Sequence, residues 1–591
     1  MSASPEIDLP KGSELGVENS GHSTGIVAFP KVDSQRSSDP AFSNSKDLEN
    51  EKFDEQEGDS TDSDHPVSSS AEEIVWTYLT FETELPHPTN LLPSTHPTTG
   101  SDHGPRPEQP NLAKYTNPFD WSEKRKNFTI WVACAITALT AYAAGSYSPG
   151  VAQMSAEWGV SNVAALVGIT TFTTGFAVAP MVLAPFSEIN GRRPVFLASG
   201  ILFVICQLCT GFTHSYAGML VVRFLVGVGG STFSTMVGGV VSDIYHAQDR
   251  NTPMALFSGA ALFGTGWGPL VSGFIAQNLS WRWIFYVQTI MNAVMVVFIC
   301  LIFKETRGSV LLSKKAKALN KWYDALEAAG YYGFNVPDPE KPHATISQRI
   351  RWKVKSDEER ASLKTMIGVS LYRPFHLLLT EPVVFWFSLW VAFSWAVLYL
   401  TLAAIPLVFQ NNHGFSLQQA NAVFAAMCVG ALIASVLSIY QEKLARKHGK
   451  LINTPEGRLY FACVESACMP IGLFMFGWTS GPNIHWIVPS IAVAIATIGI
   501  FTIYLSVFNY LADTYHRYAS SALAAQSFCR NILGGIFPLI TTQMYNQLGY
   551  GPASSLLGGI GTLLTVVPWI LVFYGPKIRA RSKFASEIMN T

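Results

Sequence analysis

The sequence is poor in charged residues. They make up 14% of the 591-residue chain, whereas hydrophobic residues make up 49%. Much of this charge lies in the first 125 residues, which are rich in Ser, Pro, Asp and Glu, as in the run at 51–65. Such a tail buries too little apolar surface to fold. The net charge of −1 offers no basis for binding nucleic acid. The composition indicates a membrane protein rather than a soluble one.

Several other signatures are missing. No apolar run precedes residue 125, so we expect no cleaved signal peptide. All eight cysteines lie within apolar runs, which argues against a disulfide framework. The Cys206–Cys209 pair lacks the second pair that zinc requires, so we expect no metal site. There is no G-x-x-x-x-G-K-[ST] loop to cradle ATP phosphates. We therefore expect that the protein is not an enzyme and holds no cofactor. We expect a proton gradient to supply the energy.

Twelve apolar runs are long enough to cross a bilayer as helices. They predict spanning helices at 128–149, 162–184, 194–213, 217–242, 253–276, 283–303, 383–408, 419–440, 459–479, 485–511, 519–542 and 553–574. The expected organisation is a disordered cytoplasmic tail (1–125), a six-helix half (126–303), a cytoplasmic central loop (304–382), a second six-helix half (383–575) and a cytoplasmic C-terminal tail (576–591).

Basic residues are almost absent from one set of loops. Of the 40 Lys and Arg residues, only Arg282 lies in a loop that would be external if the N-terminus is cytoplasmic. Arg223 and Arg530 lie within predicted helices. Cytoplasmic loops of membrane proteins carry an excess of Lys and Arg. The distribution therefore predicts that both termini are cytoplasmic.

A short internal repeat relates the two sets of six helices. Asp243-Ile244-Tyr245-His246 ends the fourth predicted helix, and Asp513-Thr514-Tyr515-His516 ends the tenth. Pro269-Leu270 in the fifth helix likewise corresponds to Pro538-Leu539 in the eleventh. Repeats in the same orientation are related by an axis along the membrane normal, and their substrate sites lie near mid-bilayer between the halves.

The loop between the second and third helices reads Ser-Glu-Ile-Asn-Gly-Arg-Arg-Pro at 187–194. Gly191 gives this tight loop backbone freedom. Glu188, Arg192 and Arg193 are expected to pair with one another and with Asp243. The loop resembles the signature G-x-L-[AS]-[DE]-x-x-G-R-[RK] of the major facilitator superfamily, with Ala in place of the leading Gly. The resemblance implies the twelve-helix fold of that family and a charged clasp that locks the two halves in one state.

The fifth helix contains Gly264, Gly268, Pro269 and Gly273. Glycines four residues apart let a neighbouring helix approach closely, and proline bends a helix. Ordinary close packing would explain this pattern. At this helix number it also resembles the antiporter motif of drug:proton exporters, although Ser272 stands where the motif has Gly. The resemblance implies export rather than import.

Four charged residues are candidates for proton coupling: Arg223, Arg530, Glu465 and Asp513. A buried cation in a spanning helix is costly and suggests a function. Arg223 matches the family pattern R-x-x-x-G, which implies that it tunes proton uptake by a neighbouring carboxylate. The alternative for both arginines is a structural one, in which they bond backbone carbonyls of neighbouring helices. Asp243 and Glu381 lie at predicted cytoplasmic helix ends like Asp513. The sequence does not choose between these three acids and Glu465 as the proton carrier.

Aromatic and polar residues of the helices are candidates for a substrate cavity, namely Tyr142, Trp390, Trp395, Tyr399, Tyr504 and Asn509. Aromatic walls suit flat ligands that are apolar or weakly cationic. Packing or lipid contact is the alternative for each of these residues taken singly.

Residues 120–575 resemble a fungal branch of twelve-helix drug:proton antiporters. Motifs that carry this similarity include Trp281-Arg282-Trp283 and Pro455-Glu456-Gly457-Arg458. We therefore expect a monomeric, proton-driven exporter of drug-like small molecules in the lipid of a plasma membrane. A polyamine exporter, or a pump for one self-made secondary metabolite, is the alternative within transport. A non-transporting sensor and a membrane enzyme are less consistent with the short C-terminal tail and the lack of a catalytic cluster.

Overall fold

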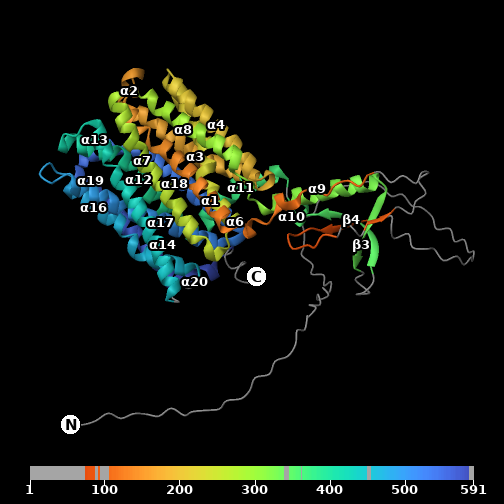
Figure 1. The fold of residues 1–591 in the computed structure, drawn as a ribbon. Coiled ribbons are helices and arrows are strands. Elements are labelled where there is room, and N and C mark those ends of the chain that lie inside the picture. The colour runs from red at the N-terminus through yellow and green to blue at the C-terminus, as the bar shows by residue number, and fades with distance from the viewer. Residues whose placement is uncertain are drawn as a thin grey trace, which may run out of the picture. The chain divides into compact units, whose positions relative to one another are not determined.

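The computed structural model describes residues 73–86, 91–93, 105–337, 345–360, 362–448, 454–582 and 584, and these residues are mainly helical (Figure 1). The helices are α1 (Glu123–Gly145), α2 (Val151–Trp158), α3 (Asn162–Asn190), α4 (Arg192–Phe212), α5 (Tyr216–Thr235), α6 (Val237–Ile244), α7 (Asn251–Asn278), α8 (Arg282–Ile302), α9 (Gly308–Ala328), α10 (Lys355–Glu358), α11 (Leu363–Thr380), α12 (Pro382–His413), α13 (Leu417–Ala422), α14 (Ala425–Lys447), α15 (Tyr460–Glu465), α16 (Cys468–Thr479), α17 (Ile487–Tyr515), α18 (Ala519–Leu548), α19 (Tyr550–Leu564) and α20 (Val566–Arg581). The strands are β1 (Ile74–Tyr78), β2 (Leu91–Pro93), β3 (Tyr331–Pro337) and β4 (Thr345–Lys353).

Twelve segments of the described chain are long and apolar enough to cross a membrane. Seven are the single helices α3, α4, α7, α8, α12, α17 and α18, and the others combine α1 with α2, α5 with α6, α13 with α14, α15 with α16, and α19 with α20. The structure confirms the predicted set of twelve. Several segments extend beyond the predicted runs, because polar residues continue the helices past the apolar stretch that a bilayer requires.

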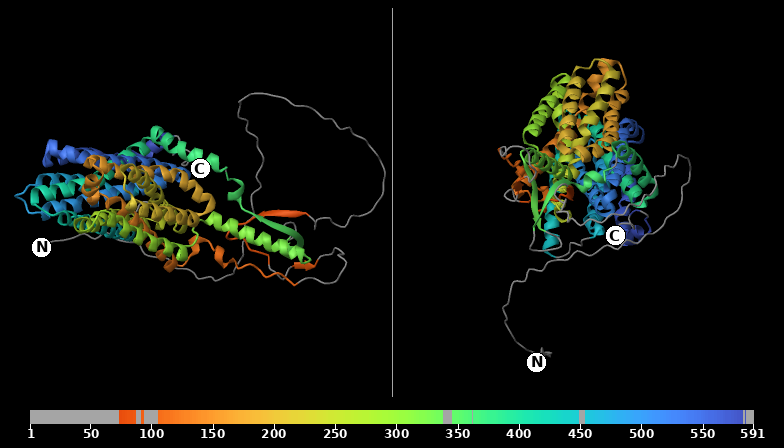
Figure 2. Two further views of the ribbon diagram at one scale, coloured as in Figure 1. Left: turned by 90° about the horizontal axis from the view of Figure 1, so that it is seen from above. Right: turned by 90° about the vertical axis from the view of Figure 1, so that its right-hand side faces the viewer.

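The two halves of six segments lie side by side. In Figure 2 the first half, in orange and yellow, occupies a different side of the bundle from the second half, in cyan and blue. The helices α7 and α14 pack together across the halves, as do α3 and α18. We call the face of the bundle that carries Arg192, Asp243 and Asp513 the loop face, because the segment 303–381 joins the halves there.

The loop-face segment is folded rather than a free loop. Strands β1 to β4 form a sheet in the order β1-β4-β3-β2, in which β1 runs parallel to β4 and β3 antiparallel to it. Helix α9 covers the sheet through a small core of its own that includes Trp322, Tyr323, Phe334 and Trp352. Figure 1 places these elements beyond one end of the helical bundle.

The expectation of a disordered tail up to residue 125 therefore does not hold for β1. The residues that form this strand, Ile-Val-Trp-Thr-Tyr, are β-branched or aromatic and have high strand propensity. Their pairing partner lies in the central segment, at Arg349–Lys353. The acidic run at 51–65, which motivated the expectation, lies outside the described residues.

Candidate functional site

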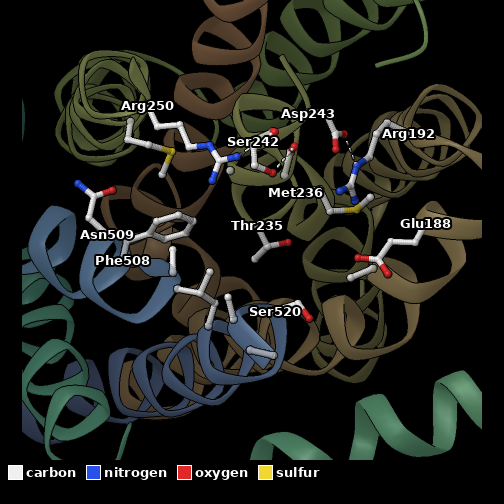
Figure 3. A pocket seen from close by; sticks show the side chains of 18 of the residues that line it. Glu188, Arg192, Thr235, Met236, Ser242, Asp243, Arg250, Phe508, Asn509 and Ser520 are labelled. Carbon is white, nitrogen blue, oxygen red and sulfur yellow. Dashed lines mark hydrogen bonds and ion pairs between the residues drawn. The ribbon is translucent and has the colours of Figure 1, made fainter. Parts of the chain in front are cut away.

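A cavity of about 970 Å³ lies between the two halves. Figure 3 shows that Thr235, Met236 and Arg250 of the first half face Phe508 and Asn509 of the second. Its lining comes from the parts of the helices nearest the loop face, and from their loop-face ends. The cavity therefore opens at the loop face.

The halves meet on the other side of this cavity. The Ser148 hydroxyl donates a hydrogen bond of 2.7 Å to the carbonyl oxygen of Leu402. The Thr170 hydroxyl donates another of 2.7 Å to the carbonyl oxygen of Gly535. Each bond joins the first half to the second. The structure is thus open toward the loop face and closed toward the opposite face.

A buried cluster of charges sits at the mouth of the cavity. Asp243, at the end of α6, is 7% exposed and accepts from Arg192 Nε at 3.1 Å and from Arg307 Nη1 at 3.0 Å. Arg192 begins α4, and Arg307 follows α8, so the cluster joins three spanning segments of the first half. In this open state the cluster ties one half together rather than joining the two halves. Locking of the halves in another state stays a prediction.

A carboxylate that the sequence analysis did not assign completes the cluster. Glu305 is 8% exposed and accepts from the backbone N–H groups of Arg192 at 2.8 Å and Arg193 at 3.1 Å, so it caps the start of α4. Gly191 has a φ of 97°, and a Cβ there would overlap the Glu305 carboxylate. The available signal was the charged run Lys304-Glu305-Thr306-Arg307 directly after a spanning helix.

Two members of the predicted clasp lie elsewhere. The side chain of Arg193 is exposed, and its guanidinium donates to the carbonyl oxygen of Cys300 at 2.9 Å rather than to an acidic side chain. Glu188 lines the cavity and forms no ion pair among the described residues (Figure 3). The ion pairs expected of Glu188 and Arg193 within the clasp are thus not formed in this state, and they stay a prediction for another state. Here Arg192 and Arg307 occupy the Asp243 carboxylate.

The second half repeats this arrangement. Asp513, near the end of α17, pairs with Arg458 at 3.1 Å, as Asp243 pairs with Arg192. Arg579 near the end of α20 pairs with Glu456 at 2.7 Å. The two aspartates of the internal repeat, Asp243 and Asp513, thus each pair with an arginine of their own half. Asp513, proposed for proton coupling, is bound to an arginine at the mouth and lines the cavity there.

Burial and charge act in opposite directions on the arginines of the mouth. Burial lowers the pKa of Arg307. The negative charges of Asp243, Glu188 and Glu305, together with the hydrogen bond to Asp243, outweigh burial and hold this pKa above its usual value. Arg250 donates to the backbone oxygens of Tyr245 and Ser242. Burial lowers the pKa of Arg250, and the more distant charges of Asp513 and Asp243 only partly offset this. The Asp243 charge thus favours a charged Arg307 in its pair.

The glycines of the predicted antiporter motif line two faces of α7. A Cβ at Gly264 or Gly268 would overlap backbone atoms of α1, at Ala138 and Tyr142 respectively. A Cβ at Gly273 would instead overlap the side chain of Asn421 on α13. Helix α7 therefore packs closely against its own half on one side and against the other half on another. Pro269 lies within the helix next to the α1 contact.

Arg223 is fully buried, with 0% exposure. It donates to the carbonyl oxygens of Gly168 at 3.3 Å and Ala143 at 3.5 Å, and its guanidinium carbon lies 4.6–4.7 Å from the ring centres of Phe172 and Tyr147. Among the described residues it pairs with no carboxylate. In this state Arg223 joins α1, α3 and α5 through carbonyls and rings, and its expected effect on a carboxylate stays a prediction.

Arg530 of α18 has a different environment. It is 2% exposed, lines the cavity, and its guanidinium carbon lies 4.4 Å from the Trp395 ring centre and 4.9 Å from that of Tyr504. Its one hydrogen bond in the described structure joins Nη2 to Ser527 Oγ at 3.5 Å. Nε and Nη1 are buried without a hydrogen-bond partner. Arg530 is therefore an incompletely satisfied cation at the inner end of the cavity.

The predicted cavity residues divide into three groups. Tyr504 and Asn509 line the cavity, and Trp395 lies one layer behind it against Arg530. Tyr142, Trp390 and Tyr399 are buried in the helix packing and are not among the lining residues in this state, so their role in a substrate cavity stays a prediction. Sequence reasoning did not select Met236, Thr235 or Gln526, which do line it.

Glu465 lies away from this cavity. It accepts hydrogen bonds from Gln441 and, at 2.9 Å, from Thr502, within the second half. It lines a separate pocket of about 60 Å³ that it shares with Asn251 and Arg458. As a proton carrier it would act beside the main cavity rather than in its wall.

Comparison with known proteins agrees with this architecture. Residues 133–538 match the Major Facilitator Superfamily. The chain belongs to this superfamily. It is therefore a multi-pass membrane transporter rather than an enzyme.

Curated fungal members of the superfamily are similar over most of their length. The chain is 34% identical to the multidrug transporter mdrA of Aspergillus fumigatus, covering 80% of this chain and 74% of the relative. It is 33% identical to the transporter paaT of Penicillium rubens, covering 79% and 82%. It is 30% identical to the efflux pump FUB11 of Gibberella moniliformis, covering 79% and 75%. The predicted membership of a fungal efflux branch is confirmed.

A solved structure supports the fold. The proton:xylose symporter XylE aligns with a TM-score of 0.54 over 76% of this chain and 97% of XylE, at 14% identity. This likeness concerns the fold alone. It confirms the predicted major facilitator architecture of two six-helix halves.

Proposed function

We propose that this transporter is a proton antiporter that exports drug-like small molecules from the cytoplasm across the plasma membrane. The observation that carries the proposal is the cavity between the halves, which opens at the loop face and is closed at the opposite face. Relatives named multidrug transporters and efflux pumps support export. So does the glycine pattern of α7, which resembles the antiporter motif.

The loop face is the cytoplasmic side in this proposal. Nearly all basic residues outside the helices belong to loops on this face, and positive charge favours the cytoplasm. Both ends of the helical bundle, Glu123 and Arg581, then lie at the cytoplasm. The described state is the one that receives substrate from inside the cell. The protein is expected to act as a monomer, since each chain contains both halves and the cavity between them.

The charge clusters suggest how the state changes. At the cytoplasmic mouth, Asp243 and Asp513 each hold arginines of their own half in this state. Closure of this mouth brings the two clusters toward each other and opens the opposite face, as in rocking of one repeat against the other. Uptake of a proton by an acidic group removes one negative charge. It would therefore shift the equilibrium between the state that is open at the loop face and the state that is open at the opposite face.

Polyamines fit this cavity poorly. Its carboxylates, Glu82, Glu188, Asp243 and Asp513, belong to loop-face ends of helices or to the tail. Its inner end carries Arg530 instead. A polycation would meet a positive charge where it needs negative ones, so the alternative of polyamine export is disfavoured.

A strain stripped of its own efflux pumps provides the test. Cells that express the protein should accumulate less of several structurally different drugs than cells with an empty vector. A protonophore should abolish this difference while ATP is held constant, because the chain has no ATP-binding loop. The measurement is intracellular drug normalised to plasma-membrane protein. Efflux that survives the protonophore but stops on ATP depletion would contradict the proposed energy source.

A further inference from the structure

The inner end of the cavity combines one cation with aromatic surfaces. Arg530 lies roughly 16 Å along α18 from the loop-face start of that helix at Ala519. Tyr504 and Phe508 of α17 line the same part of the cavity, and Trp395 of α12 stands behind Arg530. The carbonyl oxygen of the Gln526 side chain, one turn from Arg530, is also buried without a partner.

No carboxylate balances this cation in the described residues. The acids that line the cavity belong to its mouth, where Asp243 and Asp513 are already paired with other arginines. The rings of Trp395 and Tyr504 stabilise the guanidinium through their electron-rich faces. They offer no acceptor to Nε and Nη1, and buried donors without acceptors destabilise a protein. The guanidinium of Arg530 therefore lacks a negative partner and an acceptor for two of its nitrogens among the described residues.

Arg223, another buried arginine of the spanning helices, lacks a hydrogen-bond partner among the described residues only at Nη2. It is equally buried, but two backbone carbonyls accept from its Nε and Nη1, the same two nitrogens that lack partners in Arg530. Arg223 is not among the lining residues of the cavity, whereas Arg530 is. In the described structure Arg530 thus has two guanidinium nitrogens without a partner, against one in Arg223, and it is Arg530 that borders the cavity.

We infer that the transporter binds aromatic organic anions, with a carboxylate of the substrate accepting hydrogen bonds from Arg530 and its ring system lying against Tyr504 and Phe508. A guanidinium binds a carboxylate through charge-assisted hydrogen bonds, which are stronger than neutral ones. One unpaired cation matches one carboxylate and repels a cationic ligand. The inference rests on the proposed export function and replaces the expectation of weakly cationic substrates with that of monoanions.

The test uses two matched sets of compounds with purified full-length protein. Each set has one ring system, naphthalene or biphenyl, that carries a carboxylate, a carboxamide or a methylammonium group. Isothermal titration should show that the carboxylate of at least one set binds about tenfold or more tightly than its amide, and that the ammonium compound binds least.

Two variants of α18 isolate the role of Arg530. Gln526→Glu places a carboxylate one turn away as an internal partner, so it should keep the protein folded while it lowers carboxylate affinity about tenfold or more and raises ammonium affinity. Arg530→Gln should also remove the preference for the carboxylate. Gln547→Glu is the control, because Gln547 is exposed on the same helix and does not line the cavity. Gln547→Glu should retain the preference for the carboxylate over the amide. Size-exclusion chromatography and the melting temperature check that each variant is folded.

Several outcomes would overturn the inference. These are no binding of either carboxylate, equal or tighter binding of the amides or ammonium compounds, and a carboxylate preference that survives Gln526→Glu in a folded protein. Transport of the neutral dye Nile red by the parent protein is a second measurement. It distinguishes a wrong substrate class from a wrong export function. If a proton gradient drives Nile red but no carboxylate binds, only the substrate class is wrong. If the parent moves no tested compound with a proton gradient, the export function itself is wrong.

Discussion

Gly264→Ala is expected to lower transport by about tenfold or more, together with the amount of folded protein in the membrane. The new methyl group would overlap the backbone of α1 at Ala138, which cannot move aside as a side chain can. Overpacking a close contact costs about 1–3 kcal/mol, and 1.4 kcal/mol corresponds to a factor of ten. Drug accumulation in a pump-deficient strain, normalised to membrane protein, measures the effect.

Gly559→Ala is the matched control for this substitution. Gly559 also lies in a membrane-spanning helix, α19, but apart from its chain neighbours and the adjacent backbone of its own helix no described atom lies within 4 Å of the position that its Cβ would take. The substitution should leave transport at the parental level, and the higher helix propensity of alanine favours the fold. Parental transport by Gly264→Ala at parental abundance would show that α1 and α7 do not need this close approach.

Asp243→Asn is expected to destabilise the first half by about 3–5 kcal/mol, the usual cost of removing one partner from a buried ion pair. The substitution removes the negative charge that Arg192 and Arg307 share, and Arg192 is itself buried. It leaves two positive charges next to each other at the mouth of the cavity. We expect a clear fall in the melting temperature of the detergent-purified protein and a loss of transport.

An exposed ion pair serves as the control for the loss of charge. Glu359 pairs with Lys355 at 3.5 Å, and both side chains are mostly exposed. Glu359→Gln should change the free energy of unfolding by less than about 1 kcal/mol. A melting temperature of Asp243→Asn equal to that of Glu359→Gln would mean that the buried cluster does not stabilise this state.

The sequence predicted the membrane fold well, because twelve apolar runs and the distribution of Lys and Arg both follow directly from the physics of the bilayer. It also placed Arg192 and Asp243 together, since charges at the ends of neighbouring helices have few other partners in a membrane protein. It did not predict the pairing of β1 with β4. That contact joins Ile74 to Arg349, and short strands carry no sequence signal for a partner so distant.

The wall of the cavity was predicted less well for a different reason. A helix buried in a membrane bundle is apolar on all sides, so its pattern does not show which face borders the cavity. Trp390 and Tyr504 both looked like cavity aromatics, yet only Tyr504 lines the cavity. Arg530 was recognised as a costly buried charge, but its lack of acceptors became visible only when Trp395 and Tyr504 were placed around it.

The central claim, coupling of export to proton entry, is tested most directly with purified protein in liposomes that contain a pH-sensitive dye. An imposed substrate gradient should drive protons in the opposite direction, and an imposed pH gradient should drive substrate against its own gradient. Both movements should disappear in empty liposomes and when a protonophore is added. Substrate movement that neither moves protons nor responds to the pH gradient would contradict the account.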